Sequence, residues 1–422
     1  MTSRVDPTVL RRSNLGVVLR HIATEGPISR ARVAAETGLN KSTVSSLVAE
    51  LDELGLVREG ADHGRAPAVG RPATPIVITG TTVALGLEIA VDGLVAGVED
   101  LTGAVRFETR RTRMLGEDPP LRVLDDLAAL AREAFARAQT DELRVVGVGV
   151  AVPGLVDVGL RTLLRAPNLG WTQIAIGAEL EARLGLPTGV VAVGNEANLA
   201  ALAELWDGVA LDLKSFIHVT GQVGVGAGIV IDGELYRGSR GFAGELGHMT
   251  VRPDGEPCAC GARGCLETVA GLEAIRRRAG MEHPEAAGEY ETAELLAQRA
   301  AAHDAAAIAA IDEAAEALGI ALSSAINLLD LEALVLGGSY TPLCPWLVPR
   351  VRDALSTRVL AATWSQFDVR GSVLGVQAPV RGAAAIHLRA VLNRPWLVAD
   401  TRGLVPGRPR PGGTPGTESK GS

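Results

Sequence analysis

Residues 245–267 read ELGHMTVRPDGEPCACGARGCLE, and this stretch brings together His248, Cys258, Cys260 and Cys265. One imidazole and three thiolates form the ligand set of a tetrahedral structural zinc site, and four protein ligands leave no position for a catalytic water. The Cys258-x-Cys260 spacing strains a direct disulfide, whereas Gly261 and Gly264 suit a chain that folds round an ion. The stretch predicts a structural Zn cofactor, with redox-active or buried thiols as the alternative. The remaining cysteine, Cys344, is expected to be buried elsewhere.

Apolar strands and amphipathic helices alternate on both sides of this stretch. The unit before it begins with three consecutive expected strands, at residues 83–91, 94–99 and 104–109, followed by a helix over 121–139 and a strand at 145–152. From residue 215 the same order returns, with strands at 216–220, 226–231 and 234–236, helices over 292–301 and 305–328, and a strand at 333–336. Two similar units in succession predict an α/β fold of two lobes with a cleft between them.

Four segments follow from this reading. Residues 1–80 are expected to form a head, residues 81–210 the first lobe, and residues 211–399 the second lobe with the zinc loop. Residues 400–422 are rich in Gly, Pro and Ser without hydrophobic periodicity, which is typical of a disordered tail.

The head has the pattern of a winged helix-turn-helix. A first helix is expected over residues 8–23; Ser29 can cap a second helix over 30–37, and Asn40 can cap a third after a turn at Gly38. Strands at 56–58 and 75–78, joined by a polar loop, complete a wing.

Two parts of the head are candidates for DNA contact. The third helix carries small polar donors near its N-terminal end, where recognition helices meet base edges: Lys41, Ser42, Thr43, Ser45 and Ser46. In the wing, Arg71 stands between Gly70 and Pro72, a rigid presentation that suits a minor groove or a phosphate. The alternatives are a helical hairpin without a DNA role and a solvated loop carrying Arg65 and Arg71.

Charge and composition narrow the class of protein. Residues 1–80 hold ten Lys and Arg against eight Asp and Glu, whereas the whole chain has a net charge of −8. This balance is compatible with a DNA-binding head and excludes broad polyanion binding as the main activity. No run of eighteen apolar residues occurs, and residues 1–12 carry charges and a proline where a secretory signal needs an apolar run, so the protein is expected to be cytoplasmic.

The chain resembles the ROK family of repressors and sugar kinases. The resemblance covers residues 81–393 and rests on an ordered set of motifs: Gly221-Gln-Val-Gly224-Val-Gly226-Ala-Gly228, then Gly238 and Gly241, Glu245-Leu-Gly-His248, and the cysteine cluster ending in Glu267. It implies an actin-like, two-lobe sugar-kinase fold with zinc in the second lobe, and the head resembles the one fused to the family's repressors.

The resemblance also implies a sugar site, carried over position by position to Asn168, Asn195, Glu196, Glu245, His248 and Glu267. Carboxylates and amides can pair with adjacent ring hydroxyls, and His248 can give one nitrogen to zinc and the other to a hydroxyl. The alternative for each residue is an ordinary capping or surface role.

Two departures from the family pattern argue against catalysis. Its kinases open the first lobe with an Asp-x-Gly-x-Thr phosphate loop, whereas the corresponding stretch here is Glu88-Ile-Ala90-Val-Asp92, without the glycine or the threonine hydroxyl. The general-base position holds Glu196, one methylene longer than aspartate, which would misplace the carboxylate by about 1 Å and cost roughly 10²-fold in rate. No catalytic residue is therefore predicted.

These observations favour a regulator, expected to repress, whose partners are double-stranded operator DNA, a sugar effector and further copies of itself in a homodimer or homotetramer. Two rivals stand beside it: an active ATP-dependent sugar kinase with an appended head, and a regulator controlled by a protein partner.

Overall fold

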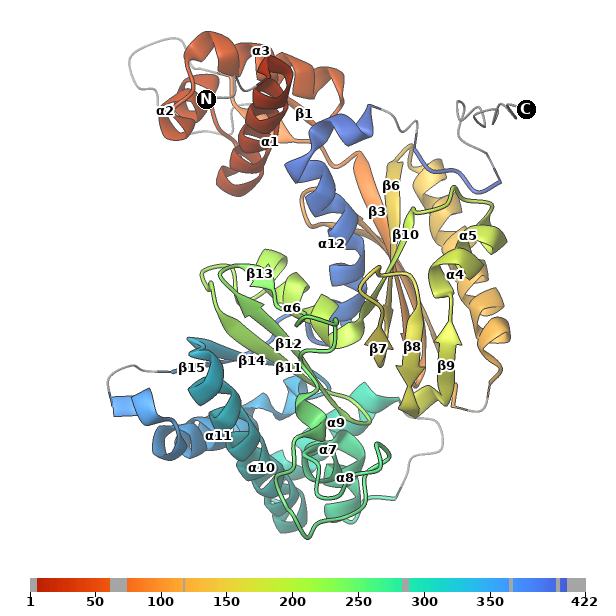
Figure 1. The fold of residues 1–422 in the computed structure, drawn as a ribbon, viewed down its shortest axis with the longest axis vertical. Coiled ribbons are helices and arrows are strands. Elements are labelled where there is room, and N and C mark those ends of the chain that lie inside the picture. The colour runs from red at the N-terminus through yellow and green to blue at the C-terminus, as the bar shows by residue number, and fades with distance from the viewer. Residues whose placement is uncertain are drawn as a thin grey trace, which may run out of the picture.

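Two five-stranded sheets with the same strand arrangement form the body of the protein (Figure 1). The computed structural model describes residues 6–60, 74–116, 118–282, 288–363, 367–399 and 403–407. Each sheet begins with an antiparallel meander of three strands, and two further strands then extend it in parallel from the first strand of the meander. This repetition confirms the predicted two-lobe α/β fold.

The first sheet has the order β10-β6-β3-β4-β5. Its strands are β3 (Thr82–Ala90), β4 (Gly93–Asp100), β5 (Val105–Thr112), β6 (Arg144–Val152) and β10 (Val191–Asn195). Its helices are α4 (Pro120–Thr140), α5 (Ile176–Leu184) and α6 (Glu196–Asp207), and a small sheet of β7 (Leu155–Val156), β8 (Leu163–Ala166) and β9 (Trp171–Ile174) lies between β6 and α5 in the chain. Every residue of β3 and β4 is buried, because α4 packs on the sheet from one helical layer and α12 from another.

The second sheet has the order β13-β12-β11-β14-β15. Its strands are β11 (Phe216–Gly221), β12 (Val225–Ile231), β13 (Glu234–Leu235), β14 (Ala333–Gly338) and β15 (Asp368–Gly371). The helices are α7 (Glu267–Ala270), α8 (Leu272–Arg278), α9 (Glu289–Ala301), α10 (Ala305–Leu329), α11 (Cys344–Arg358) and α12 (Ala378–Asn393). Cys344, expected to be buried, is partly buried at the start of α11.

Helices α6 and α12 each cross to the sheet of the other half. Helix α6 follows the first sheet in the chain but packs on β11 and β12, whereas α12 packs on β3, β4 and β6. Residues 81–210 were expected to form the first lobe and residues 211–399 the second, so the structure differs from this division at both α6 and α12. Chain order alone does not tell which sheet a terminal helix covers.

Glycines permit the close packing of α12. A Cβ added at Gly86 of β3 would lie 1.9 Å from the carbonyl oxygen of Val380, and one at Gly149 of β6 would lie 2.0 Å from that of Ala383. On α12 itself, a Cβ at Gly382 would lie 1.9 Å from the Leu199 oxygen of α6. Backbone therefore meets backbone on two sides of this helix.

The head is a winged helix-turn-helix, as predicted. It comprises α1 (Pro7–Glu25), α2 (Arg30–Thr37) and α3 (Lys41–Glu53), with an antiparallel pair of strands, β1 (Val57–Glu59) and β2 (Ile76–Ile78). The side chains of Ser29 and Asn40 cap α2 and α3, and Gly38 is left-handed with φ 72°. The wing loop with Arg65 and Arg71 lies outside the described residues.

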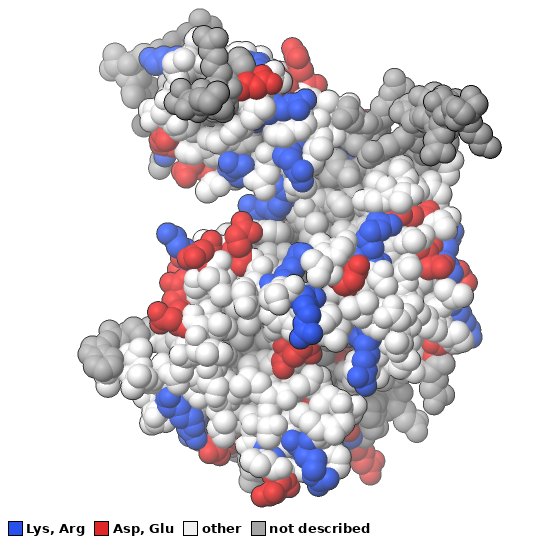
Figure 2. Space-filling model, in the orientation of Figure 1, with Lys and Arg blue, Asp and Glu red and all other residues white. Residues whose placement is uncertain are grey.

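The head is docked on the last helix of the body. Its apolar core is continuous with the buried side chains Leu388, Val391 and Leu392 of α12. Arg20 of α1 donates to Asn393 Oδ1 at 2.8 Å, and Arg144 of β6 donates to the Leu54 carbonyl at 2.9 Å. A groove separates head and body on one side, where Figure 2 shows the surface indented between them.

The expected disordered tail is partly ordered. Leu404 is buried against the first lobe and its N–H donates to the Val145 carbonyl at 2.8 Å, while the Gly407 N–H donates to the Leu184 carbonyl at 3.1 Å. One apolar side chain and two backbone bonds thus hold residues 403–407, which lack a periodic pattern because they form no helix or strand. Residues 408–422 lie outside the described part of the chain. Among the described helices, none is both long and apolar enough to cross a membrane.

Replacing Gly149 by alanine is expected to destabilise the body. The added methyl would meet the Ala383 backbone, which cannot rotate away as a side chain could, so we expect a loss of about 1–3 kcal/mol in the free energy of unfolding. Gly116→Ala is the matched control, because a Cβ there meets no atom within 4 Å. Calorimetric melting of both variants checks this; equal melting temperatures would contradict the close packing.

Candidate functional site

A cavity of about 300 Å³ opens between the two lobes. Its walls include residues from the small sheet, the β10–α6 junction, the turn after β13 and the start of α7. All six positions carried over from the family line it together: Asn168, Asn195, Glu196, Glu245, His248 and Glu267. Residues separated by up to a hundred positions in the chain thus share one polar cavity.

Asn195 and Glu196 lie at the N-terminus of α6. Asn195 caps the helix, with Oδ1 accepting from the Asn198 N–H at 3.0 Å, and its Nδ2 donates to Gly154 O and to Glu196 Oε2, both at 3.1 Å. Burial raises the pKa of Glu196 well above its ordinary value, and the nearby Glu245 and Glu88 raise it further. A protonated Glu196 can donate as well as accept a hydrogen bond.

His248 lies between two carboxylates. Its Nε2 is 3.8 Å from Glu245 Oε2, and its Nδ1 is 3.5 Å from Glu267 Oε1. Burial also raises the pKa of Glu245, which His248 partly offsets. The ring therefore has one nitrogen beside Glu245 and the other beside Glu267 and Cys258.

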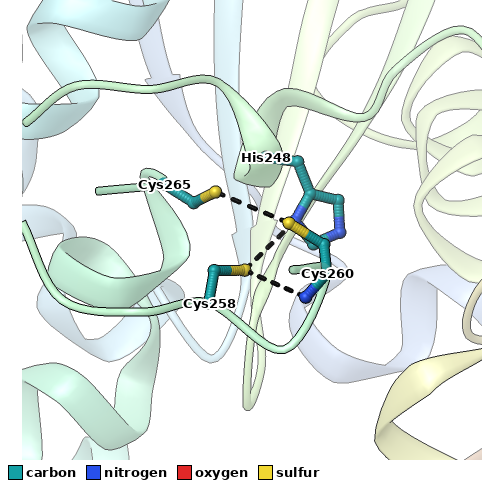
Figure 3. A group of neighbouring side chains, drawn as sticks. All are labelled: His248, Cys258, Cys260 and Cys265. Atoms are coloured by element: carbon teal, nitrogen blue, oxygen red, sulfur yellow. Dashed lines mark hydrogen bonds between the residues drawn. The ribbon is translucent and has the colours of Figure 1, made fainter. Parts of the chain in front are cut away.

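The cysteine loop gathers His248, Cys258, Cys260 and Cys265, whose ligand atoms all lie within 4.8 Å of one another (Figure 3). Cys260 Sγ is 3.7 Å from Cys265 Sγ, and Cys258 Sγ is 3.6 Å from His248 Nδ1. Two sulfurs bound to one zinc at about 2.3 Å in a tetrahedron are about 3.8 Å apart. The donor set and its spacing thus fit a tetrahedral zinc ion, with no disulfide among the described cysteines.

The loop fold depends on Gly264. Its φ is +65°, and a Cβ there would lie 1.5 Å from the Arg252 carbonyl oxygen, so the chain can double back only with glycine at this position. The loop adjoins the cavity through Glu267, whose Oε1 accepts from Cys258 Sγ at 2.8 Å. The candidate metal centre and the cavity are therefore neighbours that share His248 and Cys260.

Carboxylates gather around residues 88–92, the stretch that was expected to correspond to the family's phosphate loop. Glu88 on β3 is buried with Oε2 unpartnered among the described residues, and burial raises its pKa to about 7. Glu289 opens α9 opposite it, where its N–H donates to Asp92 Oδ2 at 3.0 Å and burial raises its pKa to about 8. Arg110 lies beside these carboxylates, with its Nη1 4.0 Å from Asp92 Oδ1.

Sequence reasoning missed three residues of these two regions. Gln222 and Phe242 line the cavity, and Glu289 completes the carboxylate group. Gln222 lies within the glycine motif of residues 221–228, and this position could have identified it. A polar side chain between glycines is less covered by neighbouring side chains and is therefore more accessible to a ligand. Glu289 gave no signal, since the helix was expected to begin at residue 292 and the contact spans nearly two hundred positions.

The candidate DNA contacts lie on α3 as expected, with one difference. Lys41, Ser42, Ser45 and Ser46 are exposed, whereas Thr43 is partly buried and its N–H bonds the Asn40 cap. The polar face is therefore narrower than the sequence suggested.

Comparison with known proteins places this geometry in a family. Residues 84–390 match the ROK family, and residues 17–66 match the MarR family. The chain is 31% identical over 400 residues to the putative xylose repressor of Caldicellulosiruptor sp. strain Rt8B.4, covering 92% of this chain and 99% of that relative. A glucokinase of Halalkalibacterium halodurans is 35% identical over 249 residues, covering 56% of this chain and 74% of the kinase.

A solved structure extends the match to the arrangement of head and body. The crystal structure of a ROK family transcriptional regulator, described as a homolog of the E. coli MLC protein, has a TM-score of 0.74 and 28% identity, with 92% of this chain and 98% of that one covered. The chain therefore belongs to the ROK family, with the architecture of its transcriptional regulators: a MarR-like helix-turn-helix head followed by a two-lobe ROK domain.

Proposed function

We propose that this protein is a sugar-responsive repressor that binds operator DNA through its head and an effector sugar in the inter-lobe cavity. The observation that carries the proposal is that head and cavity occur in one chain and are joined through α6 and α12, in a match that covers 99% of a relative called a putative xylose repressor. Xylose is therefore the first effector to test. We further propose cytoplasmic action as a homodimer or homotetramer.

The six cavity residues are the proposed sugar contacts. Glu245, Glu267 and a protonated Glu196 can bind ring hydroxyls as acceptor or donor, and Asn168 offers both. When a sugar draws the lobes together, α6 and α12 would shift against each other, and the head resting on α12 would follow. The sugar needs to favour one arrangement by about 1–3 kcal/mol in binding free energy.

The same fold raises a second candidate, an active sugar kinase. The partial match to a glucokinase favours it, but nucleotide phosphates entering beside β3 would meet Glu88, Asp92 and Glu289. Burial favours the protonated form of Glu88 and Glu289, and a protonated carboxyl offers a phosphate no compensating positive charge, whereas an ionised one repels it. We therefore propose that the protein has no kinase activity and that Glu196 only binds ligand.

A turnover assay separates the two candidates. With xylose or glucose, ATP and magnesium, we expect wild type to release ADP no faster than Glu196→Gln, which removes the carboxylate at the general-base position. Sugar-dependent release in wild type that disappears in Glu196→Gln would establish the kinase.

The cysteine loop is the proposed structural zinc site, with His248, Cys258, Cys260 and Cys265 as ligands. Cys260→Ser is expected to lose the metal and lower the melting temperature of the second lobe, because metal binding contributes folding free energy and closely spaced thiolates repel without a cation. Metal content per chain and calorimetric melting measure this. Cys344→Ser, outside the cluster, should retain the metal; zinc at wild-type level in Cys260→Ser would exclude this ligand set.

Glu245→Ala is expected to weaken the sugar response while operator binding persists. The substitution removes a hydrogen bond to a charged group, worth about 1.5–3 kcal/mol, so the sugar midpoint should rise about 10- to 100-fold. The measurement is operator affinity across a xylose titration. Glu316→Ala, an exposed glutamate on α10, is the control and should keep the wild-type midpoint.

His248→Ala serves as a second probe of the same region. It should raise the sugar midpoint and also reduce the metal content, because the ring lies beside Glu245 of the proposed sugar site and beside Cys258 of the proposed zinc site. If Glu245→Ala keeps the wild-type midpoint, the ligand binds elsewhere and the six-residue assignment is wrong.

A further inference from the structure

Arg11 of α1 lies against the recognition helix. Its Nη2 donates to Glu50 Oε2 at 2.6 Å and to Ser46 Oγ at 3.1 Å, and its Nε donates to the same Glu50 oxygen at 3.0 Å. Ser46 belongs to the candidate DNA-binding face of α3, and Glu50 stands one turn further along. The guanidinium therefore borders the surface that would meet DNA, although it comes from a different helix.

Helix geometry explains how Arg11 reaches this position. The buried residues Leu15, Val18 and Ile22 form a stripe on α1 that belongs to the core of the head, to which α3 also contributes, and Arg11 continues the stripe one turn towards the N-terminus. There the core ends, since residues 8–13 of α1 are exposed. Arg11 thus lies on the same face of α1 as the core residues, but its own side chain is exposed.

Neighbouring residues make the same surface suited to a polyanion. Ser42, Ser45, Ser46 and Ala49 form one exposed stripe on α3, at spacings of three and four residues, and are small enough for a close approach of DNA. Arg11 Nη1 makes no hydrogen bond within the described residues, so two donors are available while Nε and Nη2 are engaged.

The ion pair with Glu50 is poorly suited to a purely structural role. The two side chains are 49% and 35% exposed, and exposed pairs contribute little net free energy to folding. A DNA phosphate, by contrast, belongs to a polyanion whose neutralisation releases condensed counterions. The guanidinium also matches a phosphate in geometry as well as a carboxylate.

We propose that Arg11 is a DNA-backbone contact of the head, held over Ser46 by Glu50 in the free protein and transferred from the Glu50 carboxylate to a phosphate oxygen on binding. This inference rests on the proposed DNA-binding function. Arg11 is proposed to add affinity without reading sequence, because its guanidinium is held mainly by Glu50, one turn beyond the last of the candidate base contacts, Ser46.

The test uses the full-length protein and two DNA probes: a duplex enriched by wild type from a random 40-bp library, and an unselected duplex of equal length. Arg11→Ala should weaken binding to both and reduce the slope of log affinity against log salt by about 0.9. The ratio of wild-type to variant affinity should then shrink about 3.5-fold between 50 and 200 mM salt. Arg11→Lys should keep most of the slope, since it keeps the charge.

Replacing Glu50 is expected to change DNA affinity in the direction opposite to replacing Arg11. Glu50→Gln should tighten binding at low salt by releasing Arg11, and this gain should shrink in the Arg11→Ala background if the two residues are coupled. In a purely structural pair, both single variants would lower the melting temperature and leave the salt slope unchanged.

Arg137→Ala is the matched control. Arg137 is an exposed arginine on α4 of the body, 3.1 Å from Asp141, and lies neither in the head nor in the cavity wall. Its removal should leave both the slope and the affinity unchanged. An Arg11→Ala slope equal to that of wild type overturns this proposal and leaves DNA binding intact, whereas failure of wild type to enrich any duplex overturns both.

Discussion

Close backbone packing of α12 is the contact on which the rest of the arrangement depends. Gly86 and Gly149 lower the surface of the first sheet so that the helix lies directly on it, and Gly382 brings it against α6. Any side chain at these positions would separate the layers by more than a methyl group, and packed interiors do not absorb such changes easily. One helix thus holds the first sheet, the inter-lobe helix and the head in fixed register.

This arrangement gives the cavity a physical connection to the head. Helix α6 begins at Glu196 in the cavity wall and packs through Leu199 on Gly382, and α12 then runs to Asn393, where it contacts α1. Packed interfaces of this kind tend to have discrete alternative arrangements rather than continuous ones. A change in lobe closure would therefore be transmitted to the head as a shift of whole helices.

Three buried carboxyl groups lie close together in the body of the protein. Glu88, Glu196 and Glu289 are buried near one another, and burial raises the pKa of each, so these groups hold protons more readily than exposed carboxylates. Protonated carboxyls can donate to hydroxyls but offer a phosphate no compensating positive charge. These carboxyls supply hydrogen-bonding groups for the proposed binding of a neutral polyol.

The sequence by itself determined the winged head, the repeated strand order, the clustering of His248 with three cysteines, and the six residues that line one cavity. Short-range patterns carried these: caps, hydrophobic periods, ligand spacing and family motifs. Only the tertiary structure decided that α12 crosses to the first sheet, that Glu289 meets Asp92, and that Arg11 rests on Ser46. These contacts join residues far apart in the chain or on different helices, and no local period encodes which distant surface a helix will cover.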